Sequence, residues 1–74
     1  MSTNGITVIK DDVMIQAYPS GSRFIVVSSQ GGAEWGRVDV PSFEYAVAFI
    51  NDLIGRLQGL EFRLAWDQAL KGLR

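Results

Sequence analysis

The sequence predicts an α+β fold, in which an antiparallel β-meander of three or four strands (residues 6–40) packs against one or two C-terminal helices. Two observations support this prediction. Residues 6–40 form short β-branched and aromatic runs, separated by turns that contain Gly or Pro. After residue 42 the apolar residues recur at helical spacing instead. At 74 residues and 8.2 kDa, we expect residues 1–74 to form a single small domain.

The strands are predicted from the β-rich runs. The best run is Arg23–Ser29, which is β-branched and aromatic through its middle. Val13–Tyr18 precedes it and Glu34–Val40 follows it, with Gly36 as a candidate β-bulge. Ile6–Ile9 is a further short run, which would add a fourth strand at the start of the meander.

Two helices are predicted, at about 43–58 and 60–72. Ser42 is suited to cap the first helix, and Glu44 stands in its first turn, where the helix dipole favours a carboxylate. The apolar stripes before and after Gly59 lie more than a quarter-turn apart at ~100° per residue, which favours a break there. Residues 60–66 also alternate well enough to form a strand. We favour a helix, because helical spacing then continues without a second change of period.

The strand pairing predicts which sheet face the helices cover. A four-residue turn over Pro19–Ser22 sets Tyr18 opposite Arg23 and gathers only apolar residues of these two strands on one face. We expect the helix at 43–58 to cover that apolar face. The opposite, mixed face then carries these residues: Met14, Tyr18, Ile25, Val27, Trp35 and Arg37.

The second hairpin needs an irregularity to fit this arrangement. Val38 and Val40 reach the apolar face only if the loop has three or five residues, or if a bulge lies at Gly36. The same register sends these residues to the mixed face: Trp35, Arg37 and Asp39.

The mixed face is a candidate binding surface, since Tyr, Trp, Met and Arg are enriched at protein interfaces. Two alternatives are that Tyr18 and Trp35 pack under the second helix, and that two copies of the chain bury this face. On the first helix, Phe49 either closes the edge of the core or belongs to a contact ridge. The candidate partner-binding residues are these: Tyr18, Arg23, Trp35, Arg37, Tyr45 and Arg56.

The composition argues against catalysis. The chain has no Cys and no His, which removes thiol chemistry, the commonest general base and the commonest metal ligand. Asp11 and Asp12 form the only adjacent acid pair, and neighbouring side chains of a strand point in opposite directions. The motifs of phosphate loops and nucleophile elbows are missing. We therefore expect no catalytic residue, no metal and no cofactor.

The charge balance disfavours nucleic acid as a partner. Seven Lys and Arg against eight Asp and Glu give a net charge of −1, and the basic residues are scattered. The first residues lack the basic and apolar regions of a signal peptide, and no apolar run approaches the ~18 residues of a membrane span. With no cysteine, a cytoplasmic protein that does not enter the membrane is expected.

These observations favour a small non-enzymatic protein-binding module, an inhibitor or regulator that occupies a surface of a larger partner. In size and coarse architecture the chain resembles inhibitors encoded by phages and mobile elements, including some anti-CRISPR proteins. That resemblance implies a protein target. The alternatives are a small nucleic-acid-binding regulator, in which Arg23 and Arg37 act with Tyr18 and Trp35, and a structural homo-oligomer such as a dimer.

Overall fold

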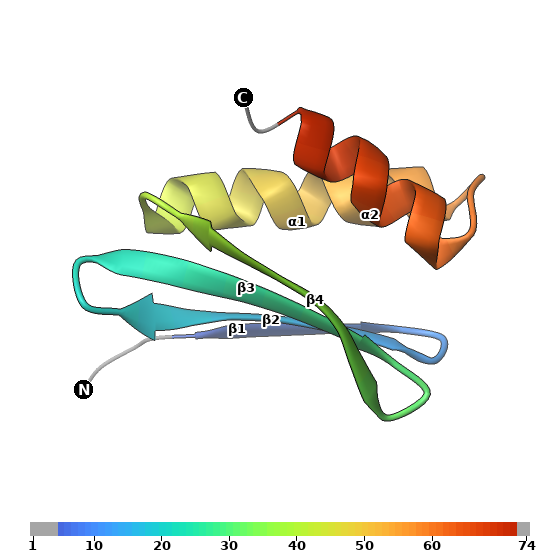
Figure 1. The fold of residues 1–74 in the computed structure, drawn as a ribbon, viewed down its shortest axis with the longest axis horizontal. Coiled ribbons are helices and arrows are strands. Elements are labelled where there is room, and N and C mark those ends of the chain that lie inside the picture. Colours follow the sequence, from blue (N-terminus) through green and yellow to red (C-terminus); the bar gives the residue numbers. More distant parts are fainter. Residues whose placement is uncertain (1–4, 73–74) are drawn as a thin grey trace.

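In the computed structural model of the chain, which describes residues 5–72, a four-stranded antiparallel sheet precedes two helices (Figure 1). The elements are these: β1 Ile6–Lys10, β2 Val13–Ser20, β3 Arg23–Gln30, β4 Ala33–Val40, α1 Phe43–Leu57 and α2 Phe62–Lys71. The strands lie in the sheet in chain order, so the sheet is a meander. Both helices lie on the same side of it (Figure 1). The predicted α+β fold is confirmed, with the larger number of strands and of helices.

Each hairpin turns on two residues. The turns are these: Asp11–Asp12, Gly21–Ser22 and Gly31–Gly32. The first residue of each turn has a positive φ, of 57° at Asp11, 65° at Gly21 and 60° at Gly31. Positive φ at this place is typical of the hairpin turns that follow the right-handed twist of the strands. Tight turns therefore set the register of the whole sheet.

The expected four-residue turn over Pro19–Ser22 is wrong. Strand β2 continues through Pro19, and Tyr18 lies opposite Ile25 instead of Arg23. Among residues 5–72, pairing between β1 and β2 stops at Ala17 and Pro19 pairs only with β3, a place that tolerates proline. Because the error is two residues and side chains alternate with a period of two, the predicted faces of both strands remain correct.

A β-bulge interrupts the pairing of β3 with β4. Ser28 lies opposite Gly36, whereas Ser29 lies opposite Glu34, so Trp35 is the extra residue. The bulge lies one residue before the expected position at Gly36. It brings Val38 and Val40 to the helix side of the sheet, where they pair with Val26 and Phe24 of β3.

The core fills the space between the inner sheet face and the helices. Strand β2 contributes Val13, Ile15 and Ala17, each at most 5% exposed. Helix α1 packs mainly over β3 and β4. Phe49 of α1 is 3% exposed and meets Trp66 of α2 edge-on, with ring centroids 5.3 Å apart. Of the two alternatives for Phe49, the structure supports a core residue.

Helix α1 begins as the sequence predicts. The Ser42 side-chain oxygen accepts a hydrogen bond from the backbone N–H of Tyr45 at 3.1 Å. The chain then leaves helical structure after Leu57, and α2 begins at Phe62, so residues 62–66 form a helix and not a strand. The buried residues of α2 are these: Phe62, Ala65, Trp66 and Ala69. Their helical spacing explains why the helix prevails.

The indole of Trp66 lies directly on the bulge. A Cβ atom at Gly36 would lie 2.5 Å from Cε2 of Trp66, closer than real side-chain carbons approach. Only glycine therefore lets α2 pack this closely on β4.

Candidate functional site

The sheet face opposite the helices, termed the outer sheet face, is built from rows of side chains. Residues that lie directly opposite each other in adjacent strands share a face. The rows across the four strands are these: Ile9, Met14, Ser29 and Glu34; Thr7, Gln16, Val27 and Arg37; Tyr18, Ile25 and Asp39, followed by Arg23 on β3. Over β1 to β3 the face therefore mixes apolar side chains with polar ones, and along β4 it is charged.

The apolar side chains of this face, Ile9, Met14, Ile25, Val27 and the ring of Tyr18, form an apolar strip. Neither α1 nor α2 covers it. Ile9 is 68% exposed, and Met14 and Tyr18 are also exposed. Val27, by contrast, is only 9% exposed although it lies on the same face as Tyr18 and Ile25. Side chains from the neighbouring strands must therefore shield Val27.

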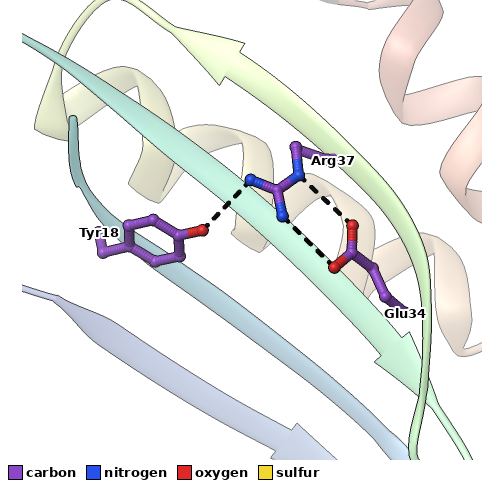
Figure 2. Close-up of polar contacts among 3 residues, drawn as sticks. All are labelled: Tyr18, Glu34 and Arg37. Atoms are coloured by element: carbon purple, nitrogen blue, oxygen red, sulfur yellow. Dashed lines mark hydrogen bonds and ion pairs between the residues drawn. The ribbon is translucent and has the colours of Figure 1, made fainter.

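A contact between Tyr18 and Arg37 spans β3 on this face (Figure 2). The Arg37 Nη1 donates to the Tyr18 hydroxyl at 3.4 Å. The Arg37 Nε and Nη2 each donate to a carboxylate oxygen of Glu34, also at 3.4 Å. The three side chains thus form a continuous polar bridge over the middle of the apolar strip.

Glu34 also stabilises the charge of Arg37. The hydrogen bonds that Arg37 donates to Glu34, and then the negative charge of Glu34, raise the pKa of Arg37 above its ordinary value, with a smaller contribution from Tyr18. Arg37 is therefore a fixed cation of the bridge. These groups are exposed, so the bridge orients side chains and adds little to the stability of the fold.

A second ion pair completes the charged edge of the outer sheet face. The Arg23 Nε lies 3.0 Å from Asp39 Oδ1, and both side chains are at least half exposed. Together with the pair of Glu34 and Arg37, it leaves this edge with two positive and two negative charges. The outer sheet face therefore carries no excess of either sign among these four groups.

Trp35 does not lie on the outer sheet face, and this part of the prediction is wrong. The bulge turns Trp35 toward α2, where its ring meets Phe62 edge-on at 6.0 Å between centroids. The Arg63 guanidinium carbon lies 5.1 Å from the centroid of the Trp35 ring, within the range of a cation–π contact. The alternative of packing against the second helix thus holds for Trp35 but not for Tyr18, which lies on the opposite side of the sheet.

Tyr45 and Arg56 lie apart from both of these surfaces, on the helical side of the molecule. Both line an open groove of about 580 Å³ beside α1 and α2. The Arg56 Nε lies 3.0 Å from Asp52, and its Nη1 donates to Gln68 of α2 at 2.9 Å. Arg56 thereby joins the two helices.

The structure therefore separates the six candidates. Tyr18, Arg23 and Arg37 share the outer sheet face, Trp35 lies at the edge of β4, and Tyr45 and Arg56 line the groove. Sequence reasoning missed Ile9 as part of the site. The two-residue turn at Asp11–Asp12 sets Ile9 opposite Met14, so correct turn lengths would have revealed it.

Within residues 5–72, no three acidic side chains gather as a metal site requires. Neither α1 nor α2 combines the length and apolar character needed to cross a membrane.

The fold and the site define a small α+β domain with both helices on one face of a meander sheet and an uncovered, mixed apolar and charged face on the other. Comparisons of the chain with protein-family models, with curated proteins and with solved structures found no match.

Proposed function

We propose that this protein is a non-enzymatic protein-binding module, which inhibits or regulates a larger protein by occupying part of its surface with the outer sheet face. One observation carries the proposal. An apolar strip lies on the side of the sheet that both helices leave uncovered, and the Tyr18–Arg37 contact crosses it. Tyrosine and arginine beside apolar neighbours are the residue types that dominate binding energy at protein interfaces.

The bridge favours binding because it orients its members in advance. Tyr18 and Arg37 come from different strands and are held by each other and by Glu34. Side chains that are already ordered lose less conformational entropy when a partner arrives. Sheet strands also hold the apolar strip in a fixed shape, which suits a partner with a flat, complementary surface.

The charges favour protein over nucleic acid as the partner. A phosphate backbone binds to Lys and Arg side chains that neutralise its negative charges. Here Arg23 and Arg37 each already have a carboxylate partner, so a phosphate has to compete with Asp39 and Glu34. A protein surface with apolar groups and charges of both signs matches the outer sheet face better. We place this activity in the cytoplasm, in keeping with the cysteine-free composition.

The test is capture of the partner with matched surface variants. The tagged chain is incubated with lysate of its source cells, with and without nuclease treatment, and bound proteins are quantified by mass spectrometry. Met14→Glu adds a charge to the exposed strip of the outer sheet face, and Leu64→Glu makes the same kind of change at an exposed position of α2. Burying an unpaired carboxylate at an interface costs several kcal/mol, so we expect Met14→Glu to lower recovery of a stoichiometric partner at least ten-fold.

The control and the contrary outcomes are specific. Recovery with Leu64→Glu should equal that of the unchanged chain, and both variants should keep the circular-dichroism melt of the unchanged chain. If Leu64→Glu lowers recovery of the partner and Met14→Glu does not, the partner binds α2 and not the outer sheet face. A catch that disappears on nuclease treatment would replace the protein partner by nucleic acid, and no stoichiometric catch at all would contradict the proposal.

A further inference from the structure

The two edges of the sheet are built differently. The β4 edge carries the bulge at Trp35 and the charged residues Glu34, Arg37 and Asp39. Bulges and charges are the features by which natural sheets prevent an edge from pairing with another chain. The β4 edge is therefore protected.

The β1 edge has less of this protection. Its sequence Ile6-Thr7-Val8-Ile9 contains no charge and no proline, and its one charged residue is Lys10 at its end, which lies opposite Val13 and so points to the helix side. Its pairing with β2 is regular over all five residues. Within residues 5–72, β2 is its only neighbour in the sheet. The outward backbone groups of β1 are thus a template for one more strand.

The core also stops short at β1. Ile6 and Val8 point to the helix side, since they lie opposite Ala17 and Ile15, which are 1% exposed. Ile6 and Val8 themselves are only half-buried, because α1 packs mainly over β3 and β4. Another apolar strand beside β1 would extend the buried layer.

We infer that two copies of this chain pair antiparallel through β1, about a two-fold axis at Val8, and join their sheets into one. The edge is self-complementary: half-buried and exposed residues alternate symmetrically about Val8. In this register Val8 lies opposite Val8 of the second copy, Ile6 opposite Lys10, and Thr7 opposite Ile9. Both copies then contribute Ile6 and Val8 to the helix side of the joined sheet, with Lys10 at each end of the paired strands.

The charges permit this pairing. The two-fold axis puts the Lys10 residues of the two copies at opposite ends of the paired strands, four residues or ~13 Å apart at ~3.3 Å per residue. That distance exceeds the screening length of ~8 Å at physiological salt. Each copy carries a net charge of only −1, so repulsion between whole molecules is small. In the joined sheet, the outer sheet faces of the two copies lie side by side and both remain accessible. The pairing is therefore independent of the proposed function.

The short edge sets the strength of the association. A strand of five residues gives an interface at the low end of the known range, below about 1,200 Å² in total. We expect a dimer with a dissociation constant on the order of 100 μM, which corresponds to about −5.5 kcal/mol.

Cysteine cross-linking tests the register directly, because the chain has no cysteine of its own. Val8→Cys places two thiols face to face on the proposed axis, and Leu64→Cys places a more exposed thiol on α2 as the control. Under mild oxidation at 100 μM, we expect Val8→Cys to form disulfide-linked dimers at least ten-fold faster than Leu64→Cys. Random collisions would favour the more exposed Leu64→Cys. Equal or slower linking of Val8→Cys overturns the inference.

The second test compares two double variants that differ in the charge placed across the axis. Analytical sedimentation at concentrations up to 1 mM measures how tightly each one dimerises. The double variant Thr7→Lys with Ile9→Lys sets lysines opposite each other across the axis, and Thr7→Lys with Ile9→Glu sets lysine opposite glutamate. Both positions are exposed, so both variants should fold. We expect the lysine–glutamate variant to dimerise at least ten-fold more tightly than the lysine–lysine variant.

The contrary results are equally clear. An unchanged chain that stays monomeric at 1 mM, or two double variants that dimerise equally, overturns pairing through β1. Adding Met14→Glu to Val8→Cys should leave the linking rate unchanged. This addition separates the dimer from the proposed partner surface, because Met14 lies on the outer sheet face and not on the β1 edge.

Discussion

Gly36 and Trp66 together determine how closely α2 can approach the sheet. The indole of Trp66 occupies the space that a side chain at position 36 would need. Trp66 in turn packs against Phe49 and Phe62, so a displaced indole would disturb the aromatic cluster between the helices. Position 36 is therefore constrained by packing and not by an unusual backbone angle.

Gly36→Ala should lower the free energy of unfolding by about 1 to 3 kcal/mol, because the added methyl group overpacks the contact with Trp66. Gly55→Ala is the matched control, since Gly55 lies in α1 with open space around it. That change should raise the free energy of unfolding by about 0.5 to 1 kcal/mol. Urea unfolding measures both. A Gly36→Ala variant as stable as the unchanged chain would mean that Trp66 does not lie on the bulge.

At this scale the sequence predicts some site residues and misses others. Tyr18 and Arg37 follow from strict alternation along their strands, and both lie where alternation places them. Trp35 does not, because a bulge displaced by one residue reverses which side a side chain takes. The contact of Arg63 with Trp35 depends on how α2 docks on the sheet, which no local pattern encodes.

Among the elements, α1 has the strongest local definition. Its cap, its acidic first turn at Glu44 and the Arg56 side chain in its last turn all agree with the helix dipole. Agreement of the local signals with the packed face explains why the predicted bounds of 43–58 fall within one residue of Phe43–Leu57.

Ser42→Ala should lower the free energy of unfolding by about 1 kcal/mol, because the N–H of Tyr45 loses its hydrogen-bond acceptor. For a domain of this size that loss corresponds to a fall of about 4 to 8 °C in the melting temperature. Ser42→Asp retains an acceptor and should melt close to the unchanged chain. Equal melting of all three chains would show that the cap contributes nothing to stability.

The elements also show why errors in loop length have unequal effects. Moving the turn after β2 by two residues leaves every side chain of that hairpin on its predicted face. For residues 60–66, alternation and helical spacing both fit the local sequence. Helical spacing continues through the following residues and favours the helix, and burial of Phe62, Ala65 and Trp66 in one cluster agrees with it.

For the whole molecule, the placement of both helices on one side means that a single core holds the fold together. Residues of α2 belong to the same buried cluster as those of β2 and β3. The radius of gyration of 11.6 Å is that of a compact fold of this length. Loss of α2 therefore affects the sheet and not only the helical side.

A chain that ends at Gly59 should lose cooperative unfolding. It lacks the buried side chains of α2 and exposes Phe49 and the inner side of the bulge. A domain of this size has little stability to spare. Far-UV circular dichroism during urea unfolding is the measurement, with the full chain carrying Leu64→Ala as the control for an exposed change in α2. A sharp transition in the shortened chain would show that residues 5–59 fold alone.

The meander order of the strands also has a consequence for biosynthesis. Because neighbours in the sheet are neighbours in the chain, the hairpins have low contact order and form within about 1 to 10 μs once they leave the ribosome. The helices that cover the sheet follow it in the chain and, at 5 to 20 residues per second, take on the order of seconds to appear. During that interval the emerged hairpins, which are only marginally stable without the helices, leave Val13, Ile15 and Val26 exposed to the surroundings. Translation of the helices is therefore much slower than formation of the hairpins, and this interval is when a chaperone would recognise the chain.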